Sequence, residues 1–368
     1  MTIWNTHWDA IVLGTGIGGG TMGRALAEAG HRVLFLEQGP RGFRTEENGL
    51  SEIFVPEARL TRGLWPDPVE VTLNGRSEQI HAPLGAGVGG SSAFYAATLE
   101  RPERHDLDDL PDRPHPTGGW PVSFDEMAPF YAQAARTYRV YGTADPLGEA
   151  PVPLRDPPAP EPVEAALMNS LSRIGLHPYH AHTGIERLPG CARCLGHKCP
   201  RSCKMDGRSA GVEPALATGH AALLDRARVT RLGTNGDQIS HVEILHDGIR
   251  RRLSARRYIL AGGALGSPHL LLKSANEAWP NGVANRSGLV GRKLMCHVNE
   301  LFALWPGRGT PDSGATKALS LRDLYYPGQR FGTIQAMGIR ASYGEIVHYL
   351  NGMLARGTLG RVKGLSHL

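Results

Sequence analysis

The sequence has no long apolar run, no cationic tract and no evenly spread cysteines, and each absence excludes a class of protein. Its first apolar stretch, Asp9–Leu13, is too short to cross a bilayer, and no charged and apolar leader precedes it. We therefore expect a cytoplasmic protein with no transmembrane segment and no cleavable export signal. Forty Lys and Arg residues stand against 35 Asp and Glu residues, a net charge of only +5, so nucleic acid is not an expected partner.

The length and composition are those of a folded globular chain. Hydrophobic residues make up 41% and charged residues 20% of the 368 positions, which excludes a disordered chain. This length is more than one compact core usually absorbs, so two lobes are expected. Six of the twelve residues in 151–162 are proline, which predicts an extended connector between them.

Local patterns predict several further elements. Apolar residues recur at helical spacing from Val163 to Ile174, which indicates a helix after the connector. Ser123 and Glu126 form a capping box that opens another helix, and Pro129 is expected to interrupt its first turns. Residues 242–253 are predicted to form two strands around a turn, and residues 258–261 a strand that enters a glycine pair.

The N-terminal segment has the pattern of a dinucleotide-binding β-α-β unit. The run Asp9–Leu13 is followed by a predicted helix over Thr21–Ala29 and by a second apolar run that ends at Glu37. The turn between the first run and the helix contains the three glycines of a G-x-G-x-x-G motif, Gly14, Gly16 and Gly19. These glycines permit a tight turn, the approach of a pyrophosphate to the backbone and close helix–strand packing.

This motif also predicts how the ligand would be held. The helix N-terminus offers free N–H groups to phosphates, and Glu37 would accept hydrogen bonds from the ribose hydroxyls of the adenosine half. The motif by itself fits FAD and NAD equally.

Four later segments distinguish between FAD and NAD, because they resemble segments of a known family. In chain order they are residues 85–95 with 100–102, residues 120–123 with 129–131, residues 263–271 with Ser274, and residues 290–295 before His297. With the first unit they resemble the glucose-methanol-choline (GMC) oxidoreductases, over a span from about Asp9 to about His297. The resemblance implies FAD as cofactor. It also implies oxidation of a CH–OH group of an alcohol, sugar or sterol to a carbonyl, by hydride transfer to the flavin.

The same resemblance implies where FAD binds. A second glycine-rich strip would lie beside the flavin and its pyrophosphate, and Val229 would lie against the adenine. The expected cofactor-binding residues are Gly14, Gly16, Gly19, Glu37, Val88, Gly89, Gly90, Ser91, Tyr95 and Val229. Tyr95 stands where many members have Asn, so it is interpreted either as a flavin contact or as a packed aromatic residue whose hydroxyl is satisfied elsewhere.

The implied fold class is α/β, with a Rossmann-like FAD-binding domain built from separated segments and an α+β substrate domain that has an antiparallel sheet. The first part of the FAD-binding domain is expected in residues 1–150 and the second part in residues 206–296. Residues 151–205 would form the connector, its helix and a cysteine-rich loop. Residues 297–368 would form an incomplete substrate domain.

No catalytic residue is predicted. Family members place a His and a second His or Asn near the C-terminus, where they position the substrate oxygen, but no His-x-x-Gly-Thr segment is found before Leu368. His348 lies in an alternating, strand-like setting that suits a structural role, and His297 is not the base in the family pattern. A small-molecule alcohol is the expected substrate, and the electron acceptor is left open.

These features leave three alternatives to an active enzyme of this family, of which a metal-binding scaffold built on the cysteine-rich loop is the most distant. The first is a truncated, catalytically inactive flavin-binding remnant of such an oxidoreductase. The second and less favoured is an NAD-dependent dehydrogenase, which the N-terminal unit alone would permit. The choice between oxidase and dehydrogenase, and the oligomeric state, are left open.

Four of the five cysteines lie within thirteen residues: Cys191, Cys194, Cys199 and Cys203. Their spacing is neither that of a zinc ribbon nor that of a ferredoxin. It resembles cysteine-bearing segments of some bacterial GMC sugar dehydrogenases, in which three cysteines hold an iron–sulfur cluster. Two local disulfides or free thiols are the alternative, so no metal ligand is assigned.

Overall fold

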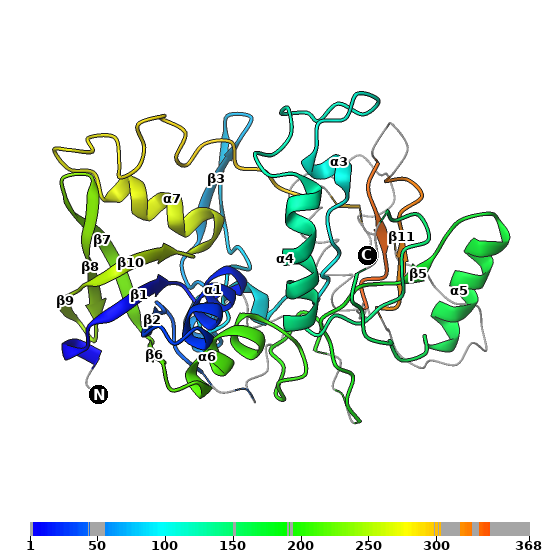
Figure 1. The fold of residues 1–368 in the computed structure, drawn as a ribbon, viewed down its shortest axis with the longest axis horizontal. Helices are drawn as coiled ribbons and strands as arrows, with labels where there is room; N and C mark the ends of the chain where they lie inside the picture. The colour runs from blue at the N-terminus through cyan, green and yellow to red at the C-terminus, as the bar shows by residue number, and fades with distance from the viewer. Residues whose placement is uncertain are drawn as a thin grey trace, which may run out of the picture. The chain divides into compact units, whose positions relative to one another are not determined.

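The computed structural model describes residues 3–42, 44, 56–149, 152–189, 191, 194–297, 299–300, 302, 317–325 and 331–338. The chain forms two compact units (Figure 1). Unit 1 comprises residues 1–144, 148–158 and 182–296, and unit 2 comprises residues 145–147, 159–181 and 297–368. Unit 1 therefore contains the cysteine-rich loop together with most of both segments predicted to bind FAD.

A parallel sheet is the framework of unit 1. It has the order β10-β1-β2-β6, and its strands are β1 (Trp8–Leu13), β2 (Val33–Leu36), β6 (Ala221–Leu224) and β10 (Ala255–Leu260). All three strand pairs are parallel. The helix α1 (Ile17–Glu28) connects β1 to β2, so the predicted β-α-β unit is confirmed, with a helix that begins earlier than Thr21.

A second, antiparallel sheet belongs to the same unit. It consists of β7 (Ala227–Asn235), β8 (Gln238–His246) and β9 (Ile249–Leu253), in that order. The two strands predicted in residues 242–253 are confirmed as the second half of β8 and the whole of β9. The strand predicted to enter a glycine pair is β10, and α7 (Gly263–Lys273) follows it.

Two cores form because alternate residues of β1 and β2 point to opposite faces of the parallel sheet. The first core joins one face to the antiparallel sheet through Ile11, Leu13, Leu34, Leu36, Leu232, Val242, Ile244 and Leu253. The second joins the other face to α1 and α6 (Glu213–Ala217) through Val12, Ala27, Val33, Phe35, Val88, Val212 and Ala215. Unit 1 is thus a three-layer α/β fold, and its strand ends carry the loops described below.

The helix α4 (Phe124–Thr137) corrects one expectation. Both hydrogen bonds of the predicted capping box between Ser123 and Glu126 are present. Pro129 lies inside the helix without interrupting it. A proline removes only one backbone donor, and the reciprocal cap fixes the first turn, so the helix continues through this position.

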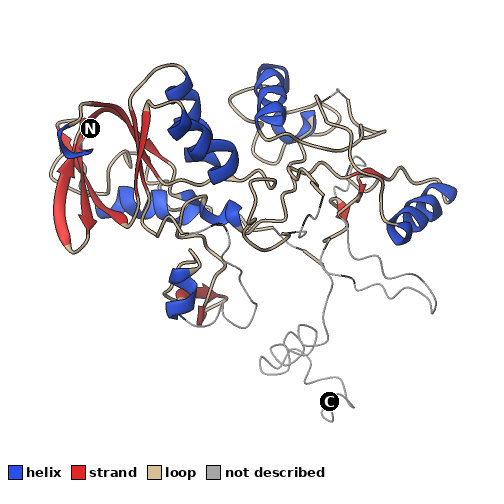
Figure 2. Cartoon of the chain, turned by 90° about the horizontal axis from the view of Figure 1, so that it is seen from below, coloured by secondary structure: helices blue, strands red, loops and turns tan. Residues whose placement is uncertain are grey.

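Shorter elements complete unit 1 (Figure 2). They are a 3-10 turn (Ile3–Asn5), α2 (Pro56–Thr61), the hairpin β3 (Val69–Leu73) and β4 (Arg76–Ile80), a second 3-10 turn (Gly90–Ala93), α3 (Arg104–Leu107) and a π-helix (Gly207–Val212).

In unit 2, the predicted helix after the connector is α5 (Pro162–Arg173). Three short antiparallel strands accompany it in the order β12-β11-β5: β12 (Ile334–Gln335), β11 (Leu319–Leu321) and β5 (Tyr179–His180). The Glu164 carboxylate of α5 accepts a hydrogen bond of 3.0 Å from the Ala318 N–H beside β11.

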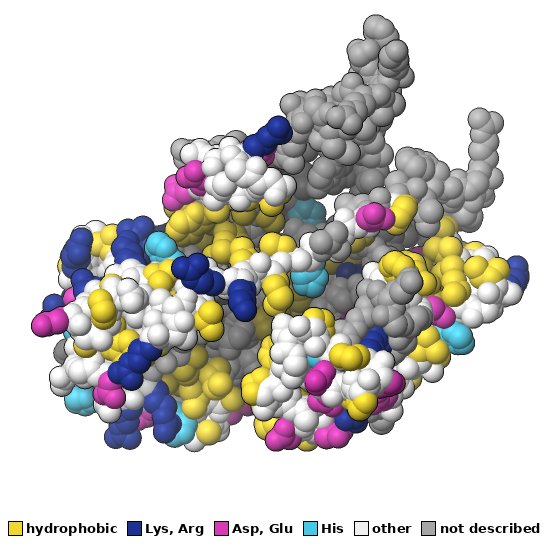
Figure 3. Space-filling model, turned by 90° about the horizontal axis from the view of Figure 1, so that it is seen from above, with side chains coloured by type: hydrophobic (Ala, Val, Ile, Leu, Met, Phe, Trp, Pro, Cys, Tyr) yellow, Lys and Arg dark blue, Asp and Glu magenta, His cyan; other side chains and the backbone are white. Residues whose placement is uncertain are grey.

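Several large apolar side chains reach the surface, and hydrophobic patches are visible on the face seen in Figure 3. Leu265 and Leu272 of α7, and Leu289, Leu294 and Met295 after it, are exposed. None of the helices in the described parts of the chain is both long and apolar enough to cross a bilayer.

Candidate functional site

The first glycine loop connects β1 to α1 and leaves empty space beside one of its three glycines, Gly16. Gly14 has φ +107°, and a Cβ there would lie 2.4 Å from the Ala261 carbonyl oxygen. A Cβ on Gly19 would lie 2.0 Å from the Gly14 oxygen. Gly16, the N-cap of α1, has no neighbouring atom within 4 Å of the position a Cβ would take. Gly14 and Gly19 therefore serve the fold, whereas Gly16 leaves room beside the helix N-terminus for a ligand.

Glu37 directly follows β2, and its carboxylate is turned back toward this loop. It is 4% exposed and accepts hydrogen bonds from the Thr15 hydroxyl at 2.5 Å, the Thr15 N–H at 3.2 Å and the Gly39 N–H at 3.1 Å. Burial raises the pKa of Glu37 to about 6, although these hydrogen bonds favour the charged form. The acid predicted for ribose binding is thus fixed in place, with an ionisation that changes near neutral pH.

The second glycine strip lies directly against the first loop. A Cβ on Gly90 would be 3.0 Å from the Gly16 Cα, and the Gly89 N–H donates to the Thr15 hydroxyl at 3.2 Å. A Cβ on Gly39 would be only 1.4 Å from the Ala86 oxygen, so the strand end after Glu37 also touches this strip. Three chain segments therefore meet here with almost no side chains between them.

The remaining residues predicted on the strip take different positions. Val88 is buried in the second core, and Ser91 is exposed, with its hydroxyl accepting from the Gly85 N–H at 2.9 Å. The Tyr95 hydroxyl donates to the Met205 carbonyl, and burial raises the pKa of Tyr95. Of the two interpretations of Tyr95, this contact favours the packed residue with a satisfied hydroxyl.

Val229 lies near the same site although it is far away in the sequence. The residues at the start of β7 are bonded to the end of β2: the Ala227 N–H donates to the Glu37 carbonyl at 2.8 Å, and the Arg226 N–H to the Gly39 carbonyl at 3.0 Å. Val229 follows two residues later and is partly buried against the first core. The structure therefore brings the predicted adenine and ribose contacts to neighbouring strand ends.

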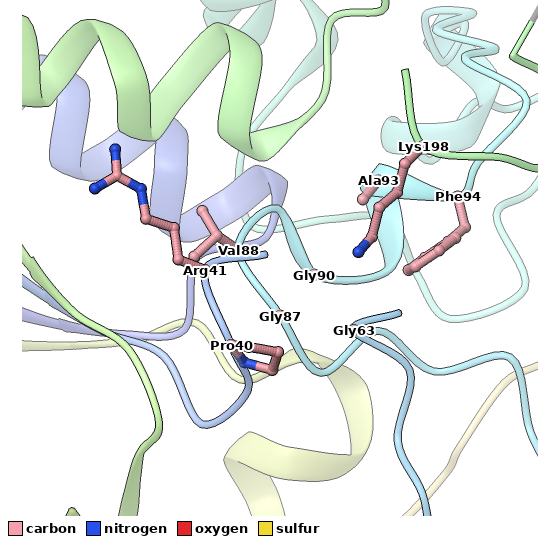
Figure 4. A pocket seen from close by; sticks show the side chains of 9 residues that line it. All are labelled: Pro40, Arg41, Gly63, Gly87, Val88, Gly90, Ala93, Phe94 and Lys198. Atoms are coloured by element: carbon pink, nitrogen blue, oxygen red, sulfur yellow. The ribbon is translucent and has the colours of Figure 1, made fainter. Parts of the chain in front are cut away.

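A pocket opens between the second strip and the segment around Gly63 (Figure 4). It is a shallow space of about 180 Å³ that includes open solvent, and it is lined by Pro40, Arg41, Gly63, Gly87, Val88, Gly90, Ala93, Phe94 and Lys198. Two backbone hydrogen bonds shape its wall, from the Ala86 N–H to the Gly63 carbonyl at 2.7 Å and from the Val88 N–H to the Pro40 carbonyl at 3.3 Å. We call this space the glycine-lined pocket.

The cysteine-rich loop packs beside the pocket and gathers three of its four cysteines. Cys194, Cys199 and Cys203 are buried together, and the sulfur atoms of Cys199 and Cys203 are 3.3 Å apart. A hydrogen bond from the Cys194 thiol lowers the pKa of Cys199, whereas burial raises the pKa of Cys203. None of the five cysteines, all of which lie in the described residues, forms a disulfide. Among the described residues, no group of three or more His, Cys, Asp or Glu side chains has an arrangement that could hold a metal ion.

Lys204 fastens this loop to the second strip. The side chain is 1% exposed, and its ammonium donates to the carbonyls of Ala93 at 2.9 Å and Cys194 at 2.9 Å. It also donates to Tyr95 O at 3.3 Å and to the His197 carbonyl. Burial lowers the pKa of Lys204 to about 8. These bonds hold the loop next to the Gly90–Ala93 turn.

Sequence reasoning missed the residues that connect the predicted contacts. Thr15 bridges Glu37 and Gly89, but it is only a variable position of the G-x-G-x-x-G motif. Gly39 could have been noticed, because a glycine two residues after the acid indicates a close backbone approach. Lys198 and Lys204 stand out in the sequence only as basic residues beside the cysteines; their contacts with Phe94 and Ala93, more than one hundred residues away along the chain, could not be predicted from that position.

A family model described as GMC oxidoreductase matches residues 9–299. The chain belongs to the GMC oxidoreductase family. FAD is the cofactor of this family, and its N-terminal fold is the α/β architecture described above. The resemblance recognised in the glycine segments is thereby confirmed.

Two relatives illustrate the match. The 2-methyl-1,2-propanediol dehydrogenase of Mycolicibacterium austroafricanum is 28% identical over 327 residues, which cover 82% of this chain and 57% of that protein. The paromamine 6'-oxidase of Streptomyces fradiae is 29% identical over 357 residues, covering 90% and 61%. The chain thus spans about three-fifths of the length of these curated relatives.

Solved structures share the fold. An FAD-dependent oxidoreductase from Chaetomium thermophilum has a TM-score of 0.52 at 21% identity, covering 73% of this chain and 48% of that one. A formate oxidase variant from Aspergillus oryzae RIB40 has a TM-score of 0.51 at 18% identity, covering 74% and 48%.

Proposed function

We propose that this chain binds FAD in unit 1 and belongs to an oxidoreductase that oxidises a CH–OH group of a small alcohol, sugar or sterol to a carbonyl. The observation that carries the proposal is the meeting of the open helix N-terminus at Gly16, the carboxylate of Glu37 and the second glycine strip. This arrangement suits a dinucleotide. Its phosphates would lie beside the N–H groups of α1, its ribose would bind the Glu37 carboxylate, and the backbone of the second strip would lie along the rest of the molecule. The substrate domain is proposed to include unit 2.

The residues present fit the cofactor on structural grounds. The space that a Cβ would fill at Gly16 is empty, and the Glu37 carboxylate has oxygen lone pairs beyond its three donors, which ribose hydroxyls could use. When bound, FAD supplies the acceptor for a hydride from the substrate carbon. Gly16 would leave space for the pyrophosphate in a loop whose shape Gly14 and Gly19 maintain, and Glu37 and Val229 would contact the adenosine half.

The rest of the proposed FAD site comes from the second strip. Gly89 and Gly90 would present backbone along the cofactor, since a side chain at Gly90 would meet Gly16. Val88 would support the strip from the core, and Ser91 and Tyr95 continue it toward the glycine-lined pocket. No residue is proposed as catalytic base.

The substrate class rests on the names of the relatives. Two of these relatives are named for a propanediol and for paromamine, and a fructose dehydrogenase large subunit from Gluconobacter japonicus, 26% identical over 344 residues, is named for fructose. Small hydroxylated molecules are therefore the first substrates to test on this chain.

The test uses the purified full chain mixed with FAD under anaerobic conditions. After unbound FAD is removed, a retained flavin spectrum is expected, and a propanediol, a sugar or a sterol from a small panel should bleach it without any added reductant. If the chain retains FAD but none of the alcohols bleaches it, the result would favour the alternative that this chain is a catalytically inactive flavin-binding remnant. Failure to retain FAD would contradict the proposed site.

A further inference from the structure

The side chain of Lys198 enters the glycine-lined pocket. Its ammonium lies 3.4 Å from the position a Cβ would take on Gly63 and 5.8 Å from the centre of the Phe94 ring. Figure 4 shows the amino group directed toward Gly90 and Phe94, whereas the Arg41 side chain is directed away from them. Lys198 is therefore the cation that faces the interior of this pocket.

The neighbours of Lys198 in the chain hold it there. The next residue, Cys199, is 3% exposed within the cysteine cluster. The ammonium of Lys204 ties the carbonyls of His197, Cys194 and Ala93 together, so the loop is attached to the turn that lines the pocket. The backbone of Lys198 is thus anchored on both sides, which limits the positions its ammonium can occupy.

The charge of the pocket has one sign. The nine lining residues include two cations and no Asp or Glu. The other walls are backbone of Gly63, Gly87 and Gly90 and small or apolar side chains. A half-buried ammonium among such walls favours a ligand that carries negative charge, because the low local polarity strengthens the attraction.

The pocket also continues the proposed FAD site. Gly90 both lines it and lies against Gly16, where the pyrophosphate would bind. Resting on the FAD site proposed above, we propose that Lys198 is a cofactor contact whose ammonium pairs with an anionic group of bound FAD. That group is either the pyrophosphate or the N1–C2=O region of the flavin, which becomes negatively charged on reduction. Both sources share one chemistry, a delocalised negative charge that oxygen atoms present to the ammonium.

Lys198→Met and Lys198→Arg test the proposal in the full chain, with Lys273→Met as the matched control because Lys273 is an exposed residue of α7. The readouts are the FAD dissociation constant, from flavin fluorescence, and the midpoint potential of the bound flavin. Loss of a charged contact is worth about tenfold or more in affinity. Unfolding temperature and circular dichroism of each variant show whether it is folded.

The two sources give different results. If Lys198 meets the pyrophosphate, Lys198→Met binds oxidised FAD about tenfold more weakly with an unchanged potential. If it meets the flavin, oxidised FAD binds almost as well, but the potential becomes more negative because the reduced anion loses its cation. In either case Lys198→Arg should stay close to the wild type in FAD affinity and flavin midpoint potential, and Lys273→Met should equal the wild type in both.

Other outcomes overturn the inference. A folded Lys198→Met with wild-type affinity and potential, or an equal effect of Lys273→Met, contradicts it while leaving the FAD site intact. If wild-type protein itself fails to bind FAD, the proposed function fails first. Should Lys198→Met not fold, Lys198→Gln with the same two readouts replaces it.

Discussion

Gly19→Ala is expected to destabilise unit 1 severely in the absence of any cofactor. The new Cβ would lie 2.0 Å from the Gly14 carbonyl oxygen and 3.0 Å from the Ala261 Cβ, and neither atom belongs to a flexible side chain that could move away. Overpacking of this kind costs about 1–3 kcal/mol or more, which outweighs the gain of up to about 1 kcal/mol from placing Ala in a helix. Thermal or urea unfolding of the cofactor-free chain measures the loss.

Two neighbouring glycines provide matched controls. Gly18→Ala meets open space in the first turn of α1, so its stability should equal or slightly exceed that of the wild type. Gly16→Ala also meets open space and should remain folded, losing less than about 1 kcal/mol as a poorer N-cap. It should nevertheless bind FAD at least about tenfold more weakly, because its methyl group occupies the space left for the pyrophosphate. Equal stability of the Gly18 and Gly19 variants would refute the packing argument.

The affinity for FAD is expected to rise as the pH rises through 6, because Glu37 must be ionised to accept the ribose hydroxyls. Burial raises the pKa of Glu37 to about 6 from 4.5. Binding at about pH 5 should then be roughly tenfold weaker than at about pH 7. Titration of FAD fluorescence across this range measures the effect, and Glu37→Gln should bind weakly with little pH dependence between these values.

The same shift affects folding with the opposite sign. The folded cofactor-free chain binds the Glu37 proton more tightly than the unfolded chain does. The resulting stabilisation is fully present below pH 4.5 and is lost as the pH rises through 6. Comparing the unfolding free energies of wild type and Glu37→Gln over this range isolates the contribution of Glu37.

A wild-type FAD affinity that is constant from about pH 5 to about pH 7 would exclude the assigned role of the carboxylate.

The sequence predicted the parts of the fold that depend on local patterns. The β-α-β unit, the capped helix α4 and the strands β8 and β9 follow from apolar periodicity, capping residues and turn residues within short windows. The effect of Pro129 was predicted wrongly, because the strength of the cap around Ser123 decides whether a helix survives an early proline. The glycines of the first loop were identified from the G-x-G-x-x-G motif, and those of the second strip through the family resemblance.

The connections between these parts could not be predicted from spacing. The contact of Gly39 with Ala86 and the bonds from the start of β7 to the end of β2 join segments that are tens to hundreds of residues apart. The difference between Gly14 or Gly19 and Gly16 likewise depends on which atoms lie beside each Cα, which the motif alone does not reveal. The burial of the Lys204 ammonium could not be predicted either, because it depends on several carbonyl groups, of which that of Ala93 is distant in the sequence.

Hydrogen–deuterium exchange of the full chain with and without FAD tests the central claim most directly. If FAD binds where the two glycine segments meet Glu37, protection should appear in residues 14–20, 37–39 and 85–95 and at the start of β7. Residues 69–80 of the exposed hairpin should exchange at the same rate in both samples. Protection that is absent from the two glycine segments, or confined to other parts of the chain, would contradict the account.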